Sequence, residues 1–145
     1  MKALTRLAIA VSLTLIVSGC RTSRSVELRT SRAGVSPTHT NGVTSDTAVE
    51  IFRDVANQMG FTVQGPERVS RSKTNYIAMG PQGTRYTSPD LVLWIKPKSL
   101  RFVSSSYGTK KDWPIAQDGG DRLKKALEAH NAKYAARRFV AVSPK

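Results

Sequence analysis

Residues 91–104 read LVLWIKPKSLRFVS and form the clearest structural signal in the chain. The run 91–95 is apolar throughout, and residues 100–104 combine Leu, Phe and Val with one Arg and one Ser. Between them Lys96-Pro97-Lys98-Ser99 supplies turn residues, so the stretch predicts a β-hairpin. Because its first arm is apolar on both sides, we expect a central strand. That strand would be covered on both faces, or its outer face would meet a partner.

Shorter strands are predicted on both sides of this hairpin. Residues 61–64 favour a strand that stops at Gly65-Pro66, and residues 75–79 favour another that stops at the turn 80–83. Near the end of the chain, residues 139–142 predict a short closing strand.

Two amphipathic helices are predicted to flank the strands. The first would begin at Ser45 or Asp46 as N-cap and end before Gly60, with an apolar stripe of Ala48, Ile51, Phe52, Val55 and Met59. The second would begin within Asp118-Gly119-Gly120-Asp121, with Asp118 or Asp121 as its N-cap. Its stripe is Leu123, Ala126, Leu127, His130 and Tyr134.

These elements together predict a two-layer α+β sandwich. Its antiparallel sheet would have three to five strands, with both helices on one face and the order α-β-β-β-β-α(-β). The length of 145 residues fits one small domain of this kind, which we place at residues 46–145.

The amino-acid composition excludes several kinds of site. The chain has one Cys and two His, so neither a disulfide framework nor a multi-cysteine zinc site is available. It carries 23 Lys and Arg against 10 Asp and Glu, a formal net charge of +13. A strongly basic surface of this kind favours anionic partners.

The first twenty residues have the organisation of an export signal. Lys2 and Arg6 precede the apolar run 7–17, and the small residues Ser18-Gly19 come before Cys20. The apolar run is shorter than the roughly 20 residues that span a bilayer. We therefore expect residues 1–19 to be a cleaved signal peptide.

The sequence Val17-Ser18-Gly19-Cys20 resembles the lipobox of bacterial lipoproteins. The resemblance implies cleavage before Cys20 and acylation of that residue, which would anchor the protein to a membrane without spanning it. It also implies export. Because Arg21 follows Cys20 instead of Asp, it favours the periplasmic face of the outer membrane if the source has two membranes. Nucleic acid is then not expected as a physiological partner.

Residues 21–45 contain no aromatic residue and are dominated by Ser, Thr, Arg and Gly. Such a composition buries too little apolar surface to offset the entropy of ordering. We therefore predict that residues 20–45 are the lipidated Cys and a flexible basic tether, at most about 85 Å long when extended.

No catalytic, metal or cofactor site is expected. His130 lies on a predicted apolar stripe, and Asp118-Gly119-Gly120-Asp121 lacks most of the ligands of a calcium loop. Glu67, Asp90 and Asp112 lie in predicted loops and could form a carboxylate pair only if the fold brought them together. An enzyme or enzyme inhibitor acting on cell-wall glycan is therefore the alternative function.

The leading hypothesis is a non-enzymatic envelope lipoprotein that binds an acidic partner. That partner would be an envelope protein in an assembly or secretion complex, or a polyanion such as lipid headgroups, lipopolysaccharide or peptidoglycan. If Trp94 and Arg101 project away from the helices, they would form an aromatic and basic surface. The candidate surface residues are Arg68, Arg71, Lys73, Arg85, Trp94, Lys96, Lys98, Arg101, Lys110, Lys111 and Trp113.

Overall fold

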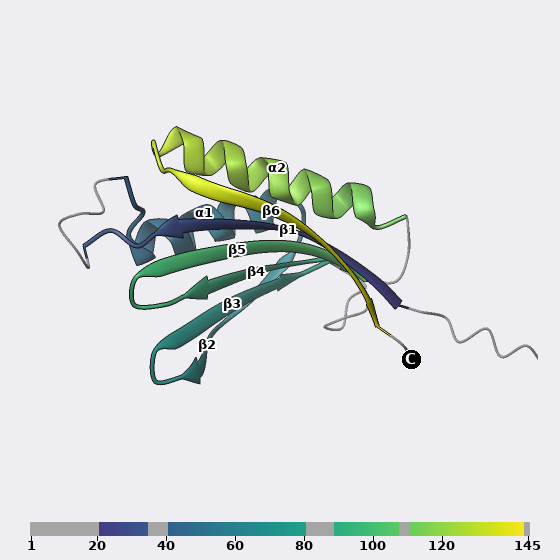
Figure 1. The fold of residues 1–145 in the computed structure, drawn as a ribbon, viewed down its shortest axis with the longest axis horizontal. Helices are drawn as coiled ribbons and strands as arrows, with labels where there is room; N and C mark the ends of the chain where they lie inside the picture. Colours follow the sequence, from purple (N-terminus) through teal and green to yellow (C-terminus); the bar gives the residue numbers. More distant parts are fainter. Residues whose placement is uncertain (1–20, 35–40, 81–88, 108–110, 144–145) are drawn as a thin grey trace, which may run out of the picture.

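The computed structural model describes residues 21–34, 41–80, 89–107 and 111–143. They form six strands and two helices: β1 (Arg21–Ser31), α1 (Ser45–Gln58), β2 (Thr62–Ser70), β3 (Lys73–Met79), β4 (Asp90–Ile95), β5 (Ser99–Tyr107), α2 (Trp113–Ala129) and β6 (Tyr134–Ser143). The strands make one sheet in the order β2-β3-β4-β5-β1-β6, and all neighbours are antiparallel. Both helices cover the same face of this sheet (Figure 1). The expected two-layer architecture is confirmed, with six strands where three to five were predicted and with an added first strand.

The prediction of a flexible tether over residues 20–45 is wrong for the residues that the structure describes. Residues 21–31 form β1, which lies between β5 and β6 and pairs with both. The chain then stays ordered at Val43, whose amide donates to the Ser31 carbonyl at 3.0 Å. The described domain therefore includes residue 21 instead of starting at residue 46, whereas residue 20 and residues 35–40 lie outside the described residues.

Composition misled here because β1 needs few apolar side chains of its own. Val26 and Leu28 are buried beneath α2, and backbone hydrogen bonds to neighbours on both sides satisfy the strand. Glu27, which lies between them, points to the other face of the sheet, since side chains alternate along a strand. Two apolar anchors in a central position are enough to order the segment.

The predicted hairpin is confirmed, with longer arms. Its strands are β4 and β5, and the pairing sets Leu93 opposite Phe102 and Trp94 opposite Arg101. Leu93 and Phe102 are fully buried against the helices. β2 also exceeds its prediction, because it continues through Gly65-Pro66 with an irregular register instead of stopping there.

The first helix is confirmed with a different cap. Thr44, one residue before the predicted start, is the N-cap, and its Oγ1 accepts a hydrogen bond from the Thr47 amide at 3.1 Å. Met59 is the C-cap, and Gly60 follows at φ +69°, the left-handed conformation that glycine adopts without strain.

The second helix begins earlier than predicted, at Trp113, with Pro114 in its first turn. Gly119 and Gly120 therefore lie inside the helix and not at its start. A Cβ on Gly119 would lie 2.5 Å from Ser104 Oγ, and one on Gly120 would lie 2.9 Å from Val26 Cγ1. The glycine pair lets α2 lie close on the sheet.

The end of α2 also differs from its prediction. The helix ends at Ala129, so His130 is an exposed cap residue and not part of an apolar stripe. Asn131 has φ +53°, and Tyr134 already belongs to β6, which starts well before the predicted closing strand at 139.

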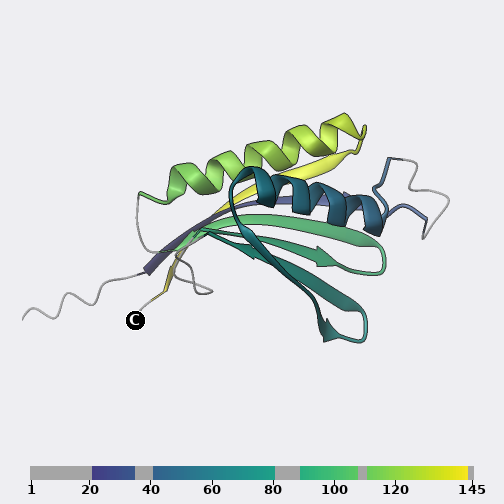
Figure 2. The same ribbon diagram turned by 180° about the vertical axis from the view of Figure 1, so that it is seen from behind.

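The sheet has two distinct ends. The β2–β3 and β4–β5 turns share one end, because Thr74 lies opposite Ile95; we call it the hairpin end. At the other end β1 begins beside the last residues of β6, and α2 begins nearby (Figure 2). We call this second one the β1 end.

Candidate binding face of the sheet

The face of the sheet that the helices leave uncovered carries the residues of interest; we call it the open face. Residues directly opposite each other in paired strands point to the same face. The register places Asn75 opposite Trp94, Trp94 opposite Arg101, and Arg101 opposite Arg29. These four side chains therefore form one row across β3, β4, β5 and β1. Trp94 and Arg101 therefore project away from the helices, which is the condition that the aromatic and basic surface required.

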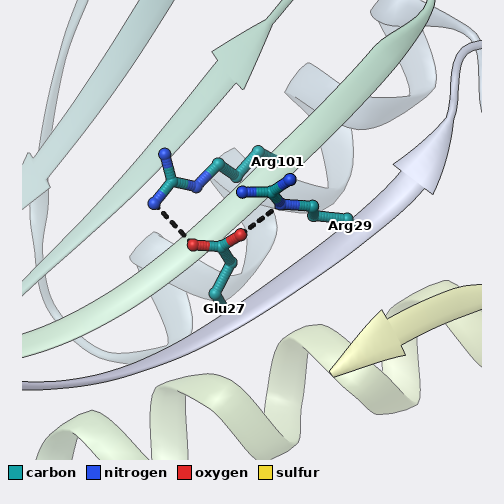
Figure 3. A network of polar contacts seen from close by, with 3 residues as sticks. All are labelled: Glu27, Arg29 and Arg101. Carbon is teal, nitrogen blue, oxygen red and sulfur yellow. Dashed lines mark hydrogen bonds and ion pairs between the residues drawn. The ribbon is translucent and has the colours of Figure 1, made fainter. Parts of the chain in front are cut away.

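Glu27 anchors the basic side of this row (Figure 3). Its side chain is 1% exposed, Arg29 Nε donates to its Oε1, and Arg101 Nη2 lies 2.5 Å from its Oε2. A carboxylate this deeply buried needs such partners, because an unpaired buried charge costs several kcal/mol. The trio still carries one positive charge in excess. Arg101 Nε is buried, and no hydrogen-bond partner for it is found in the part of the chain that the structure describes.

Lys73 and Trp94 form the aromatic side of the row. The Lys73 Nζ lies 3.5 Å from the centre of the Trp94 ring, a cation–π contact. Burial, followed by the charges of Lys96 and Arg101, lowers the pKa of Lys73 from its usual 10.5. Like charges therefore crowd around Lys73, and a bound anion would relieve their repulsion.

The remaining candidate residues divide between the two ends of the sheet. Arg68, Arg71, Lys96 and Lys98 are exposed at or near the two turns of the hairpin end. Lys111 and Trp113 lie instead at the β1 end. There the Arg24 guanidinium is 5.9 Å from the centre of the Trp113 ring. Arg85 and Lys110 lie outside the described residues. The predicted single surface is thus two surfaces, one near each end.

A hollow of about 470 Å³ adjoins the row on the side of β2. It is lined by Gln64, Gly65, Pro66, Glu67, Asn75, Ile77 and Met79. Asn75 is fully buried there, and its side-chain amide, oriented to satisfy both of its polar atoms, donates to the Glu67 carbonyl oxygen at 3.0 Å. The hollow lies beside Trp94, because Asn75 is opposite Trp94. An extended ligand on the open face would have room there.

The acidic residues considered for catalysis do not share one place. Glu67 lies opposite Asn75, whereas Asp90 lies opposite Met79, four residues further along β3. At 3.3 Å per residue that separation is about 13 Å, more than paired carboxylates of a glycan hydrolase have. Asp112 is the N-cap of α2 at the β1 end.

The calcium-like segment also has another role. Asp118 Oδ2 accepts from Arg122 Nε at 2.8 Å, and Asp121 Oδ1 lies 3.3 Å from Lys124 Nζ, so both carboxylates are paired on the surface of α2. Within residues 21–34, 41–80, 89–107 and 111–143, no three His, Cys, Asp or Glu side chains group as metal ligands do. In the same ranges, no helix combines the length and hydropathy that a membrane span requires.

Sequence reasoning missed Glu27 and Arg29, which it had assigned to the tether. The stretch Val26-Glu27-Leu28-Arg29 alternates apolar and charged residues with a period of two. That alternation is a strand signal and could have identified them. Their neighbours Ser and Thr masked it.

Comparisons with known proteins give no family. No family model and no curated protein matches the chain. Among solved structures, an aminobenzoyl-glutamate utilization protein from Klebsiella pneumoniae is similar over 87% of this chain and 30% of that one, with 12% identity and a TM-score of 0.39. A hydantoinase/carbamoylase family amidase from Burkholderia ambifaria is similar over 88% of this chain and 29% of that one, with 16% identity and a TM-score of 0.35. The chain spans less than a third of either structure, and likenesses this weak carry no argument about function.

Proposed function

We propose that this chain is a non-enzymatic envelope lipoprotein, anchored through Cys20, whose open face binds an acidic partner. Residues 1–20, which hold the lipobox-like sequence, lie outside the described residues, so the anchor rests on the sequence alone. The binding role rests on the open face.

One arrangement carries the binding proposal. Trp94 lies between Lys73, which stacks on its ring, and Arg101, which lies opposite it on β5. Aromatic and Arg side chains contribute most of the energy at protein interfaces. The excess positive charge of the Arg29–Glu27–Arg101 trio, with Lys73 close to Trp94, favours a negatively charged ligand. The partner that fits is an acidic protein surface or an anionic polymer.

The test is chemical crosslinking of the protein in its native envelope, followed by identification of what co-purifies. We expect a discrete acidic partner, which the double variant Lys73→Glu/Trp94→Ala loses. A hot-spot loss of about 2 kcal/mol corresponds to roughly thirtyfold weaker binding. Arg101 is left unchanged, because its removal would leave Glu27 without its less exposed partner.

The matched control is Lys125→Glu, which makes the same charge change on the exposed surface of α2. Retained co-purification in Lys73→Glu/Trp94→Ala, or an equal loss in Lys125→Glu, would contradict a role for the open face. The anchor is tested separately by the mass of the purified protein. Cys20→Ser should lack the added acyl groups and leave the membrane fraction.

A further inference from the structure

The chain enters the sheet directly after Cys20. Arg21 is the first residue of β1 and lies opposite Ser143 of β6, and Ser23 lies opposite Tyr107 of β5. A single peptide bond therefore joins Cys20 to a strand that has neighbours on both sides. If Cys20 is acylated, as proposed above, the β1 end of the domain is held at the bilayer surface.

The chemistry of the β1 end suits that position. Four large apolar side chains are exposed among the described residues, and three of them, Ile115, Phe139 and Val140, lie in the half of the domain nearest Arg21. Val140 is opposite Arg24, and Ile115 is in the first turn of α2. The fourth, Val69, is at the hairpin end.

Basic and aromatic residues accompany these apolar side chains. Arg24 stacks over Trp113, and Lys111 is exposed just before α2. Trp rings favour the boundary between water and lipid, and Lys and Arg near the surface of an anionic leaflet each contribute about 1 kcal/mol. Apolar, aromatic and cationic groups at one end form the combination that a phospholipid surface binds.

The hairpin end lies far from this boundary. The row that contains Trp94 crosses β1 at Arg29, eight residues beyond Arg21. At 3.3 Å per residue this places the row about 26 Å from the start of the strand. The exposed charges of Lys96 and Lys98 lie further still.

We infer that the β1 end docks on an anionic phospholipid surface, while Trp94 and the hairpin end stand off the membrane. This inference rests on the proposed lipid anchor and deepens it. The headgroups of the leaflet that holds Cys20 then lie beyond the reach of the Lys73–Trp94–Arg101 group. The acidic partner of the open face is a protein or polymer that stands away from that leaflet.

The two Trp residues, one in each region, provide the experiment. The full lipidated protein is purified from membranes and placed in phosphatidylglycerol–phosphatidylethanolamine vesicles with brominated acyl chains, which quench Trp emission. Trp94→Phe leaves Trp113 as the reporter, and Trp113→Phe leaves Trp94. We expect Trp113 to lose most of its emission and Trp94 to keep nearly all of it.

Two results would overturn the inference: quenching of Trp94 as strong as that of Trp113, which means that the open face lies on the lipid, or quenching of neither. The mass of the same sample reports acylation of Cys20 independently. An unacylated protein refutes the anchor and the docking together, whereas an acylated protein with the wrong quenching pattern refutes only the docking.

A pair of surface variants tests the docking without replacing Trp113, whose replacement could itself damage the β1 end. In the Trp94→Phe background, Val140→Asp at the β1 end should reduce the quenching of Trp113, while Val69→Asp at the hairpin end should leave it unchanged. Both side chains are exposed, so both variants should keep the fold. Equal quenching in the two variants would contradict docking through the β1 end.

Discussion

The two faces of the sheet bury side chains by different means, and β1 shows both. Val26 and Leu28 point toward the helices and are buried by apolar contact. Glu27, between them, is just as buried on the open face, where two arginines surround it. One face is therefore stabilised by packing, and the other by charge pairing. The packed face holds the fold together, and the charged face keeps one positive charge in excess.

The largest difference between the faces should appear when neighbouring residues of β5 are truncated. Phe102 is fully buried beneath the helices, and Val103 is only partly buried on the open face. We expect Phe102→Ala to lower the free energy of unfolding by roughly 3–5 kcal/mol and Val103→Ala by less than about 1.5 kcal/mol. Urea denaturation measures both. Equal losses would show that the open face is also a packed interior.

Truncating the two arginines of the open face should separate their contributions. Arg101→Ala should lower the free energy of unfolding by about 2 kcal/mol, because the buried Glu27 loses its less exposed partner. The Arg29 side chain is 53% exposed, so Arg29→Ala should cost less than about 1 kcal/mol. Thermal and urea unfolding of the two variants provide the check. A larger loss for Arg29→Ala would mean that the pairing is organised differently.

On the packed face, Gly120→Ala tests how closely α2 lies on the sheet. Its Cβ would meet Val26 at 2.9 Å, an overlap that costs about 1–3 kcal/mol, against a gain of up to about 1 kcal/mol in helix propensity. A net loss of about 1 kcal/mol is expected. Because the overlap is with Val26, Val26→Ala should cost less in the Gly120→Ala background than in the wild type. Additive effects in this double-mutant cycle would argue against the close contact.

The smallest effect should come from Lys73 on the charged face. Its pKa is lowered by burial and then by Lys96 and Arg101, so the unfolded chain binds more protons just below pH 10.5. Stability due to this group should therefore rise with pH as the pH approaches 10.5 from below. Subtracting the unfolding free energy of Lys73→Met from that of the wild type isolates this rise.

The control for this pH dependence is Lys125→Met on α2, which should leave the rise in place. The raised pKa of Tyr134, caused by its hydrogen bond to Glu128, makes stability fall above about pH 10 in every variant, so it cancels in the difference. A difference between wild type and Lys73→Met that does not change with pH would contradict the crowding of cations around Lys73.

The features that could be predicted from the sequence are those with a strong signal in neighbouring residues. The hairpin at 91–104, the helix ended by Gly60, and the two-layer architecture follow from hydrophobic periodicity and turn residues, which act over a few neighbouring positions. The conditional prediction that Trp94 and Arg101 share the open face also follows from such a local rule. They lie opposite each other across a short turn, and alternation then places both on one face.

The signals that failed depend on distant neighbours. Asp118-Gly119-Gly120-Asp121 favoured the start of a helix, but the two glycines lie inside α2, where the sheet beneath requires small residues. Glu27 and Arg29 belonged to a segment whose composition predicted a tether, and their partners lie at Arg101 and on β6.

The sequence by itself therefore determined the helices, the central hairpin, the basic character and the lipobox-like start, because each depends on residues close along the chain. Only the tertiary structure decided that β1 lies between β5 and β6, that Glu27 is buried with two arginines, and that the basic residues divide between two ends. Those features depend on pairing between segments far apart in the chain. The energy that orders them comes from the assembled sheet and not from the segments themselves.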